Sequence, residues 1–552
     1  MRRPRLNTLL AATFSFFTVV VSAQDGKSFL DGGSLTGNLQ LNAQYYMEDS
    51  IIGAPDVPEK FLSNGSAELQ YRLRNFSAGL RYEFYLNPML GTDQQYKGQG
   101  ISYYYANFIS KQFDITLGSF YEQFGSGLIF RTYRDQDLGL DNAMNGALVK
   151  FLPSNGITLK GLIGKQRYYW DYSDGIIRGF DGEISLNDAL SEIKNNKFRT
   201  TLGASFVSKY QEPTLYLVGS DQVNFPENVA AIAGRANLSY EGFNLQGEYA
   251  YKYNDPSAAN DYIFRPGQAL LLSGSYSQKG LGIMITAKRV DNMSYKSDRR
   301  VLGNMLNINY LPSTTRQHTY ALPAMYPYET QPDGEMAIEG DITYTIPKGS
   351  PLGGKYGTEL RVNYSRVQSI EKRWLSENPE GTYGYDSDFF KVGDELYYQD
   401  FNFEITKKFN RTWKAIFMYM NLNYNKSVIL VEPGEPNVKA NIIVGDVTYN
   451  IDKVHSIRME AQHLWTKQDD GNWAYLGLEY SIAPKWFFSL SDMYNYDITN
   501  EHYYSGAIAY TLGGNRVQIG YGRTRAGVNC SGGVCRYMPA TNGFNIAISS
   551  TF

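Results

Sequence analysis

The sequence predicts an all-β fold, a transmembrane antiparallel up-and-down β-barrel of about 24 strands with a range of roughly 20 to 26. Three observations predict it. The chain ends on an alternating segment whose last residue is aromatic, it begins with an export signal, and tight turns alternate with long connections along its length.

The last nine residues alternate between two kinds of side chain. Phe544, Ile546, Ile548 and Phe552 fall on one face, whereas small and polar residues fall on the other. A period of two is what a strand needs when one face meets hydrocarbon and the other a polar lumen. A terminal Phe is similar to the C-terminal insertion signal of bacterial outer-membrane barrels, so we expect these four residues to form an assembly signal for the barrel-assembly machinery.

The first 23 residues indicate secretion. Arg2, Arg3 and Arg5 precede an apolar run at 9–21, and Val21-Ser22-Ala23 is a small-x-small cleavage site. The apolar run is too short to span a bilayer as a helix. We therefore expect a signal peptide at 1–23 and a single outer-membrane barrel domain at 24–552.

Composition agrees with a barrel better than with a soluble globule. The chain has 46 Tyr and 53 Gly, yet its mean hydropathy is -0.39. Alternating strands dilute hydropathy because half of each faces water, and Tyr suits the two interfacial girdles. Removing the leader takes away three Arg and no acid, so the charge goes from -3 to -6. A mildly acidic chain gives no reason to expect nucleic acid as a partner.

Tight turns fall on every second connection. They are placed at 75, 241–242, 279–280, 408–411, 452–455, 483–485 and 513–515. The connections between them are longer and more variable. Short periplasmic turns and long extracellular loops are typical of outer-membrane barrels, so both termini are expected on the periplasmic side.

A barrel of this size encloses a lumen that its own strand side chains cannot fill. Few residues separate Gln24 from the first strand, which leaves no room for an N-terminal plug domain. The long outer connections at 121–145 and 289–335 are therefore expected to fold partly into the lumen.

Charged residues in these two connections are candidates for a lumen constriction. They are Glu122, Arg131, Arg134 and Asp135 in the first, and Arg289, Arg299 and Arg300 in the second. Facing carboxylates and guanidiniums would set a transverse field on passing solutes. The alternatives are an exposed first loop whose charges pair among themselves, and a second loop whose Arg and Tyr residues form a sugar- or peptide-binding surface or a self-packed core.

Two cysteines and four histidines complete the inventory of reactive side chains. Cys530 and Cys535 lie in the last long loop of a secreted chain with no other Cys, which predicts a local disulfide. The histidines, His318, His455, His463 and His502, do not sit in a triad or metal-ligand pattern. The sequence predicts no catalytic residue, no metal site and no cofactor, so we expect a protein that is not an enzyme.

Several motifs taken together resemble an outer-membrane barrel family of Bacteroidota without an established activity. They lie at 120–128 (FYEQFGSGL), 138–142 (LGLDN), 289–293 (RVDNM), 309–312 (NYLP), 326–328 (YPY), 353–357 (GGKYG) and 530–535 (CSGGVC). The resemblance runs over nearly the whole mature chain. It implies a barrel fold and an outer-membrane address, and it carries over no catalytic residue.

Two functions follow from these expectations. The first is a channel or gated pore for polar solutes, constricted by inward loops. The alternative is a non-conducting barrel that acts as a scaffold or assembly partner for surface lipoproteins or secreted proteins. In either case outer-membrane lipid and lipopolysaccharide would surround the barrel.

Overall fold

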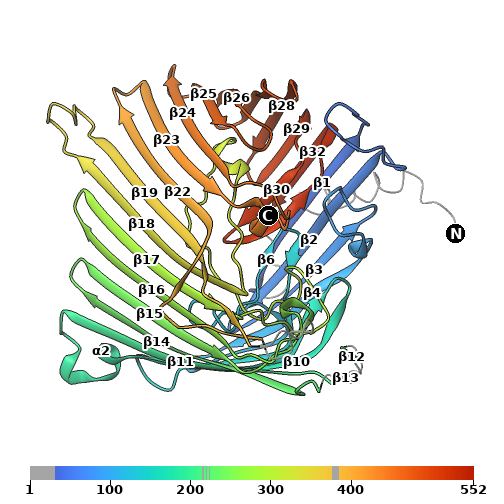
Figure 1. Ribbon diagram of the computed structural model, residues 1–552, viewed down its shortest axis with the longest axis vertical. Helices are drawn as coiled ribbons and strands as arrows, with labels where there is room; N and C mark the ends of the chain where they lie inside the picture. Colours follow the sequence, from blue (N-terminus) through green and yellow to red (C-terminus); the bar gives the residue numbers. More distant parts are fainter. Residues whose placement is uncertain (1–31, 214–216, 219–220, 223, 376–383) are drawn as a thin grey trace.

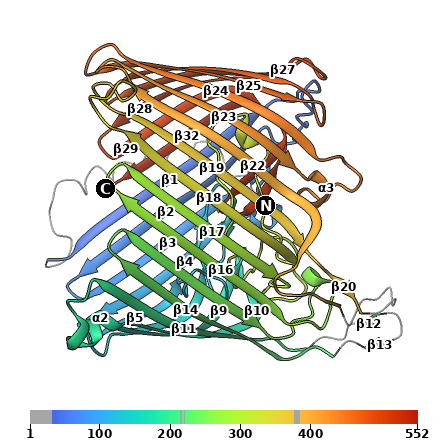
Figure 2. The same cartoon turned by 60° about the vertical axis from the view of Figure 1, so that its left-hand side comes forward.

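A single antiparallel sheet of 24 strands closes on itself in the computed structural model (Figures 1 and 2). The structure describes residues 32–213, 217–218, 221–222, 224–375 and 384–552, so the expected signal peptide at 1–23 lies outside the described residues. The first strand, β1 (Ser34–Tyr46), pairs with the last, β32 (Thr541–Thr551). The predicted barrel fold and strand number are confirmed.

The strands between them follow one another around the barrel in chain order. They are β2 (Phe61–Leu73), β3 (Phe76–Tyr85), β4 (Gly98–Ile109), β5 (Phe113–Phe120), β8 (Met144–Phe151), β9 (Ile157–Tyr168), β10 (Asp171–Ser185), β11 (Phe198–Tyr210), β14 (Asn228–Tyr240), β15 (Phe243–Lys252), β16 (Gly267–Gln278), β17 (Leu281–Asp291), β18 (Gly334–Ile346), β19 (Thr358–Ile370), β22 (Val392–Lys408), β23 (Trp413–Tyr424), β24 (Val438–Asn450), β25 (His455–Thr466), β26 (Trp473–Ile482), β27 (Trp486–Asn495), β28 (Glu501–Leu512) and β29 (Asn515–Thr524).

Smaller elements lie in the connections. They are the strand pairs β6 (Arg134–Asp135) with β7 (Leu140–Asp141), β12 (Leu217–Val218) with β13 (Asp221–Gln222), β20 (Arg373–Trp374) with β21 (Tyr385–Asp386) and β30 (Gly527–Ser531) with β31 (Val534–Met538), and the helices η1 (Gln94–Tyr96), α2 (Leu186–Ala189), η2 (Ser191–Ile193), η3 (Ala258–Asn260), η4 (Pro323–Met325) and α3 (Lys426–Ile429). Within the described ranges, none of the helices has the length and apolarity that crossing a bilayer requires.

Side chains alternate between an apolar outer face and a polar inner face. In one region of the barrel, Phe544 of β32, Ile519 of β29 and Leu490 of β27 point outward and are more than half exposed. The intervening positions face the lumen. The outer face therefore has the character of a surface that meets hydrocarbon.

Aromatic cross-strand pairs lie at one end of the barrel, close to the tight turns. They are Phe113 with Phe151, Phe243 with Tyr276, Trp413 with Tyr449 and Trp486 with Tyr510, with ring centroids 4.3 to 4.7 Å apart. Such a girdle marks a membrane–water interface. Its position places the turns on one side of the membrane and the long loops on the other.

The alternation of turns and loops holds with some exceptions. On the turn side, the connections at 186–197 and 347–357 are long, whereas on the loop side 169–170 is a tight turn. The first is ordered by Asn187, whose amide donates to the carbonyls of Ile193 and Phe198 at 3.0 Å each. The indole of Trp170 donates to the Tyr96 carbonyl at 2.7 Å, which fixes the tight turn to the neighbouring loop.

Candidate functional site: three loops inside the barrel

The first inner loop, loop A (121–143), packs its apolar side chains against the barrel wall. Phe124, Leu128, Ile129 and Phe130 are fully buried in a cluster that includes the small wall residues of β14, β15 and β16, namely Ala231, Ala233, Ala250 and Ala269. Small inner side chains leave room for a loop. Burying each large apolar side chain contributes about 1.5–3 kcal/mol, so the cluster fixes loop A firmly.

Gly125 lets loop A pass over the wall. Its φ is 52°, and a Cβ there would lie 2.5 Å from a carboxylate oxygen of Glu248 on β15. The next residue, Ser126, donates its N–H to that carboxylate at 2.6 Å. This position therefore requires glycine, in agreement with a loop that folds inward.

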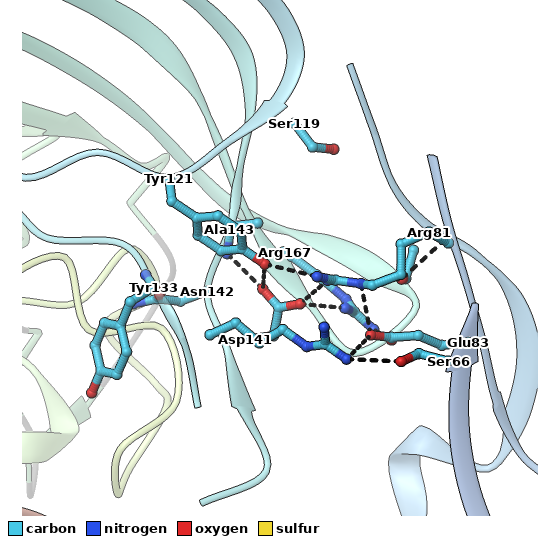
Figure 3. A network of polar contacts seen from close by, with 12 residues as sticks. Ser66, Arg81, Glu83, Ser119, Tyr121, Tyr133, Asp141, Asn142, Ala143 and Arg167 are labelled. Atoms are coloured by element: carbon cyan, nitrogen blue, oxygen red, sulfur yellow. Dashed lines mark hydrogen bonds and ion pairs between the residues drawn. The ribbon is translucent and has the colours of Figure 1, made fainter. Parts of the chain in front are cut away.

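A buried network of charges joins loop A to the part of the wall that flanks its own strands (Figure 3). Asp141 and Tyr121 of loop A meet Arg81 and Glu83 of β3 and Arg167 of β9. Arg167 lies 2.7 Å from both carboxylates, Arg81 lies 2.9 Å from Glu83 and also contacts Asp141, and the Tyr121 hydroxyl donates to Asp141 at 3.0 Å. Removing one partner from a buried pair of this kind costs about 3–5 kcal/mol.

The second inner loop, loop B (292–333), contacts two different parts of the inner wall. Its beginning, with Met293, Tyr295 and Ile308, joins the apolar cluster that holds loop A. Its later part, with Leu322, Met325, Tyr326 and Tyr328, joins a second cluster on β22 to β26. Loop B therefore crosses the lumen.

Polar contacts hold the crossing segment of loop B. Arg316 lies 2.8 Å from Glu404, His318 lies 2.6 Å from Asp400, and the Tyr320 hydroxyl donates to Asp446 at 3.2 Å. These partners are on β22 and β24. The three loop residues alternate in the sequence, which is the signal that could have identified them.

Wall lysines donate to backbone carbonyls at the beginning and middle of loop B. Lys209 of β11 donates to the Lys296 carbonyl at 2.8 Å, Lys252 of β15 to Ser294 at 2.5 Å, and Lys288 of β17 to Pro312. All three side chains are buried. Lysines on β11, β15 and β17 thus bind the backbone of loop B directly.

Hairpin C (525–540) lies on loop B and contains the disulfide between Cys530 and Cys535. The Tyr310 hydroxyl donates to the Gly532 carbonyl at 2.6 Å, and the Thr330 N–H donates to the Gly533 carbonyl at 3.0 Å. Loops A, B and hairpin C together are called the plug below.

In loop A, the four predicted constriction residues have separate partners. Glu122 lies 2.6 Å from Lys150 and 2.9 Å from Lys160, and these lysines outweigh burial and keep its pKa below the ordinary value. Arg134 lies 2.5 Å from Glu68, and Asp135 accepts the Leu138 N–H. Arg131 stacks on Tyr310 of loop B, with its guanidinium carbon 4.0 Å from the ring centroid.

The predicted residues of the second connection lie toward the outer rim. Arg289 is 3.0 Å from Asp291 and stacks on Phe389, so it faces the loop at 371–391. Arg299 donates to Gln211 at 3.0 Å, and Arg300 lies 2.8 Å from Asp298. The seven residues attach loops to the wall or to one another at separate places, and a transverse field across one constriction stays a prediction.

The sequence-based selection missed the charged wall residues. Arg81, Glu83, Arg167 and the three wall lysines belong to strands, whereas the predicted constriction was confined to the two long connections. Each occupies an inner position in its strand's alternation, which is the signal that could have found them.

Cavities lie around the crossing segment of loop B. One of 580 Å³ is lined by residues 316–321 and by Glu404, Arg458, Glu460 and Glu479 near the turn-side ends of their strands. Another of 200 Å³ lies between loop B and hairpin C, lined by Tyr310, Tyr326, Tyr328 and Cys530 among others.

The proposed assembly residues lie at the closure of the barrel. Phe544, Ile546 and Ile548 are opposite Tyr45, Ala43 and Leu41 of β1. Phe552 exchanges backbone hydrogen bonds with Gly37 at 3.0 and 3.1 Å, and its ring covers that glycine.

Solved structures of low similarity share the barrel architecture. The siderophore receptor PirA from Pseudomonas aeruginosa has a TM-score of 0.41 at 9% identity, covering 94% of this chain and 80% of its own. The P pilus usher (PapC) translocation pore gives 0.39 at 9%, covering 94% and 99%. Acinetobacter baumannii OccAB4 gives 0.33 at 9%, covering 84% and 98%.

These likenesses concern the overall barrel fold alone. A search of curated protein sequences finds no match. The expected source in Bacteroidota stays a prediction. Residues 6–552 match the profile described as "Family of unknown function (DUF6029)", and the chain therefore belongs to that family.

Proposed function

We propose that this protein is an outer-membrane pore for polar solutes, held closed by its own plug. The observation that carries the proposal is the course of loop B, which crosses a polar-walled lumen between two separate apolar clusters. Wide barrels conduct unless something fills them, and here the filling consists of loops from the same chain.

The apolar outer face and the aromatic girdle support the membrane address. In this proposal outer-membrane lipid and lipopolysaccharide surround the outer face. The barrel-assembly machinery reads the final strand, and the export signal at 1–23 brings the chain to the periplasm.

Single-channel recording in planar bilayers tests the pore. We expect rare openings from the wild type and frequent openings from a variant in which residues 296–331 are replaced by a short Gly-Ser linker. Shortening the turn 347–357, on the other end of the barrel, is the matched control and should leave conductance unchanged. Heat-modifiability on gels verifies that each variant is folded.

A folded, inserted loop B variant that does not conduct would overturn the proposal. That outcome would favour the alternative, a scaffold or assembly partner for surface lipoproteins or secreted proteins. The joining of loops A and B and hairpin C by direct contacts favours this second candidate. It predicts stoichiometric co-purification of a partner in mild detergent, and a barrel that purifies alone would count against it.

A further inference from the structure

We propose that the lumen around the cavity of 580 Å³, near the turn-side end, selects cations over anions, because the carboxylates on its wall outnumber the guanidiniums that they contact. This inference rests on the proposed pore function and names the class of solute that the pore admits.

Arg458 on β25 is the clearest example. Its guanidinium lies 2.9 Å from Asp446 on β24 and 2.9 Å from Glu479 on β26, and it also contacts Glu460. Three carboxylates therefore surround one cation. The side chains of Arg458 and Glu479 are about one third exposed to the cavity of 580 Å³.

Carboxylates also outnumber guanidiniums on β22, close to the same cavity. Arg316 pairs with Glu404, and Asp400 faces His318. Around this cavity five carboxylates, Asp400, Glu404, Asp446, Glu460 and Glu479, stand against two guanidiniums, which gives a formal charge of -3 with His318 neutral.

The same imbalance recurs elsewhere on the wall. On β14, Arg235 lies 2.7 Å from Asp181 and 3.0 Å from Glu183. On β19, Arg361 lies 2.8 Å from Asp341, and Glu339 is nearby on the same strand as Asp341.

Lys150 and Lys160, which share Glu122, supply the opposite balance. Four further basic side chains occupy inner positions at the turn-side ends of their strands, namely Arg72, Lys408, Lys414 and Arg516. None of these basic side chains lines the cavity of 580 Å³, where the carboxylates stay in excess. A cavity whose lining carries an excess of one sign of charge raises the local concentration of the opposite ion.

Cations and anions also differ in what they would meet at these sites. A cation that enters beside Glu479 or Glu183 approaches a carboxylate only partly occupied by its guanidinium. An anion would have to displace a carboxylate from Arg458 or Arg235, and each of these already has more carboxylate partners than it can neutralise.

Reversal potentials in a KCl gradient test the inference, measured on the loop B variant, which keeps all wall carboxylates. We expect potassium to be preferred over chloride by about threefold or more at 0.1 M salt. The preference should fall at 1 M, because screening shortens the reach of a charge from about 10 Å to about 3 Å.

Removing acids should weaken the preference. The pair Glu460→Gln and Glu479→Gln, and separately Asp181→Asn with Glu183→Gln on another part of the wall, should each lower it by about twofold. The two pairs lie on different parts of the wall, so the test remains possible if one of the variants misfolds. Glu241→Gln is the matched control, because Glu241 pairs with Lys197 in an exposed turn outside the lumen.

Conductance without cation preference, or a preference that neither pair of substitutions changes, would overturn the inference alone. A loop B variant that does not conduct would overturn the pore itself, and the selectivity with it.

Discussion

Gly125 shows how much of the plug depends on single residues. Replacing it with Val would impose a left-handed backbone that costs about 1–2 kcal/mol and would push Cβ into the Glu248 carboxylate. We expect loop A to leave the wall more often, so that the open probability in planar bilayers rises by about 5–30-fold.

Gly282 on β17 offers a matched control for that substitution. It faces the lumen in phase with Lys288, and a Cβ there would meet nothing within 4 Å. Gly282→Val should leave gating unchanged. Equal gating in the Gly125 and Gly282 variants would contradict the assigned role of Gly125.

Phe552 and Gly37 close the barrel as a pair. Deleting Phe552 removes the last backbone pair of the β1–β32 ladder and the ring that covers Gly37. We expect clearly less heat-modifiable, membrane-inserted protein.

Gly37→Val tests whether Phe552 acts by packing on β1 or by being recognised by assembly factors. A Cβ at position 37 would collide with the Phe552 ring, yet Phe552 itself stays in the chain. If assembly factors read Phe552 itself, Gly37→Val should insert better than the deletion. Thr551→Ala, which keeps the pairing, serves as the control. Normal insertion of the Phe552 deletion would refute the role of the terminal residue.

Lys296 makes the closed plug sensitive to pH. Burial, with a smaller effect of Lys209, lowers the pKa of Lys296 to about 7 from an ordinary value of 10.5. Its amine donates to the Gly303 carbonyl at 2.5 Å and to the Asn307 side chain at 2.6 Å. In an opened loop the amine would recover its ordinary pKa.

Between these two pKa values the closed state binds fewer protons than the open state. The cost of burying the ammonium is therefore full below pH 7 and is relieved as the pH rises toward 10.5. We expect the open probability to fall from pH 7 to pH 10, by up to about tenfold per pH unit. Lys296→Met should remove this dependence and Lys279→Met, in a turn, should keep it; a flat wild-type profile would argue against the assignment.

Hairpin C is held on the plug by its contacts with loop B. Its disulfide closes a short loop, so it stabilises the hairpin locally and contributes little to the barrel. Because Gly532 and Gly533 of this hairpin contact loop B, we expect the double substitution Cys530→Ser and Cys535→Ser to insert normally but to open more often. Single-channel recording with and without a reductant measures this. An assembly defect, or unchanged gating, would contradict it.

At the scale of the whole molecule, period-two patterning and turn signals predicted the barrel, its strand number and its closure. These are local properties of the chain, because each strand alternates and each tight turn is short. The predicted folding of 121–145 and 289–335 into the lumen also agrees with the structure.

The arrangement inside the lumen could not be predicted in the same way. Asp141 meets Arg81 and Arg167 because loop A, which connects β5 to β8, folds back over the inner face of the sheet, where β3 and β9 flank β4, β5 and β8. Such contacts join residues far apart in the chain, and no local pattern encodes them. The expected order of turns and loops was likewise wrong at 186–197, 347–357 and 169–170. Asn187 orders the first of these connections and Trp170 orders the last.

The plug consists of three separate connections whose ends are strands of the barrel itself. It cannot leave the lumen as one body, as a detachable domain would. Loop A, loop B and hairpin C are each anchored at both ends to strands, and the contacts that join them, such as Arg131 on Tyr310 and the Tyr310 hydroxyl to Gly532, must break before one of them moves alone. Opening should therefore proceed through several subconductance levels rather than a single step.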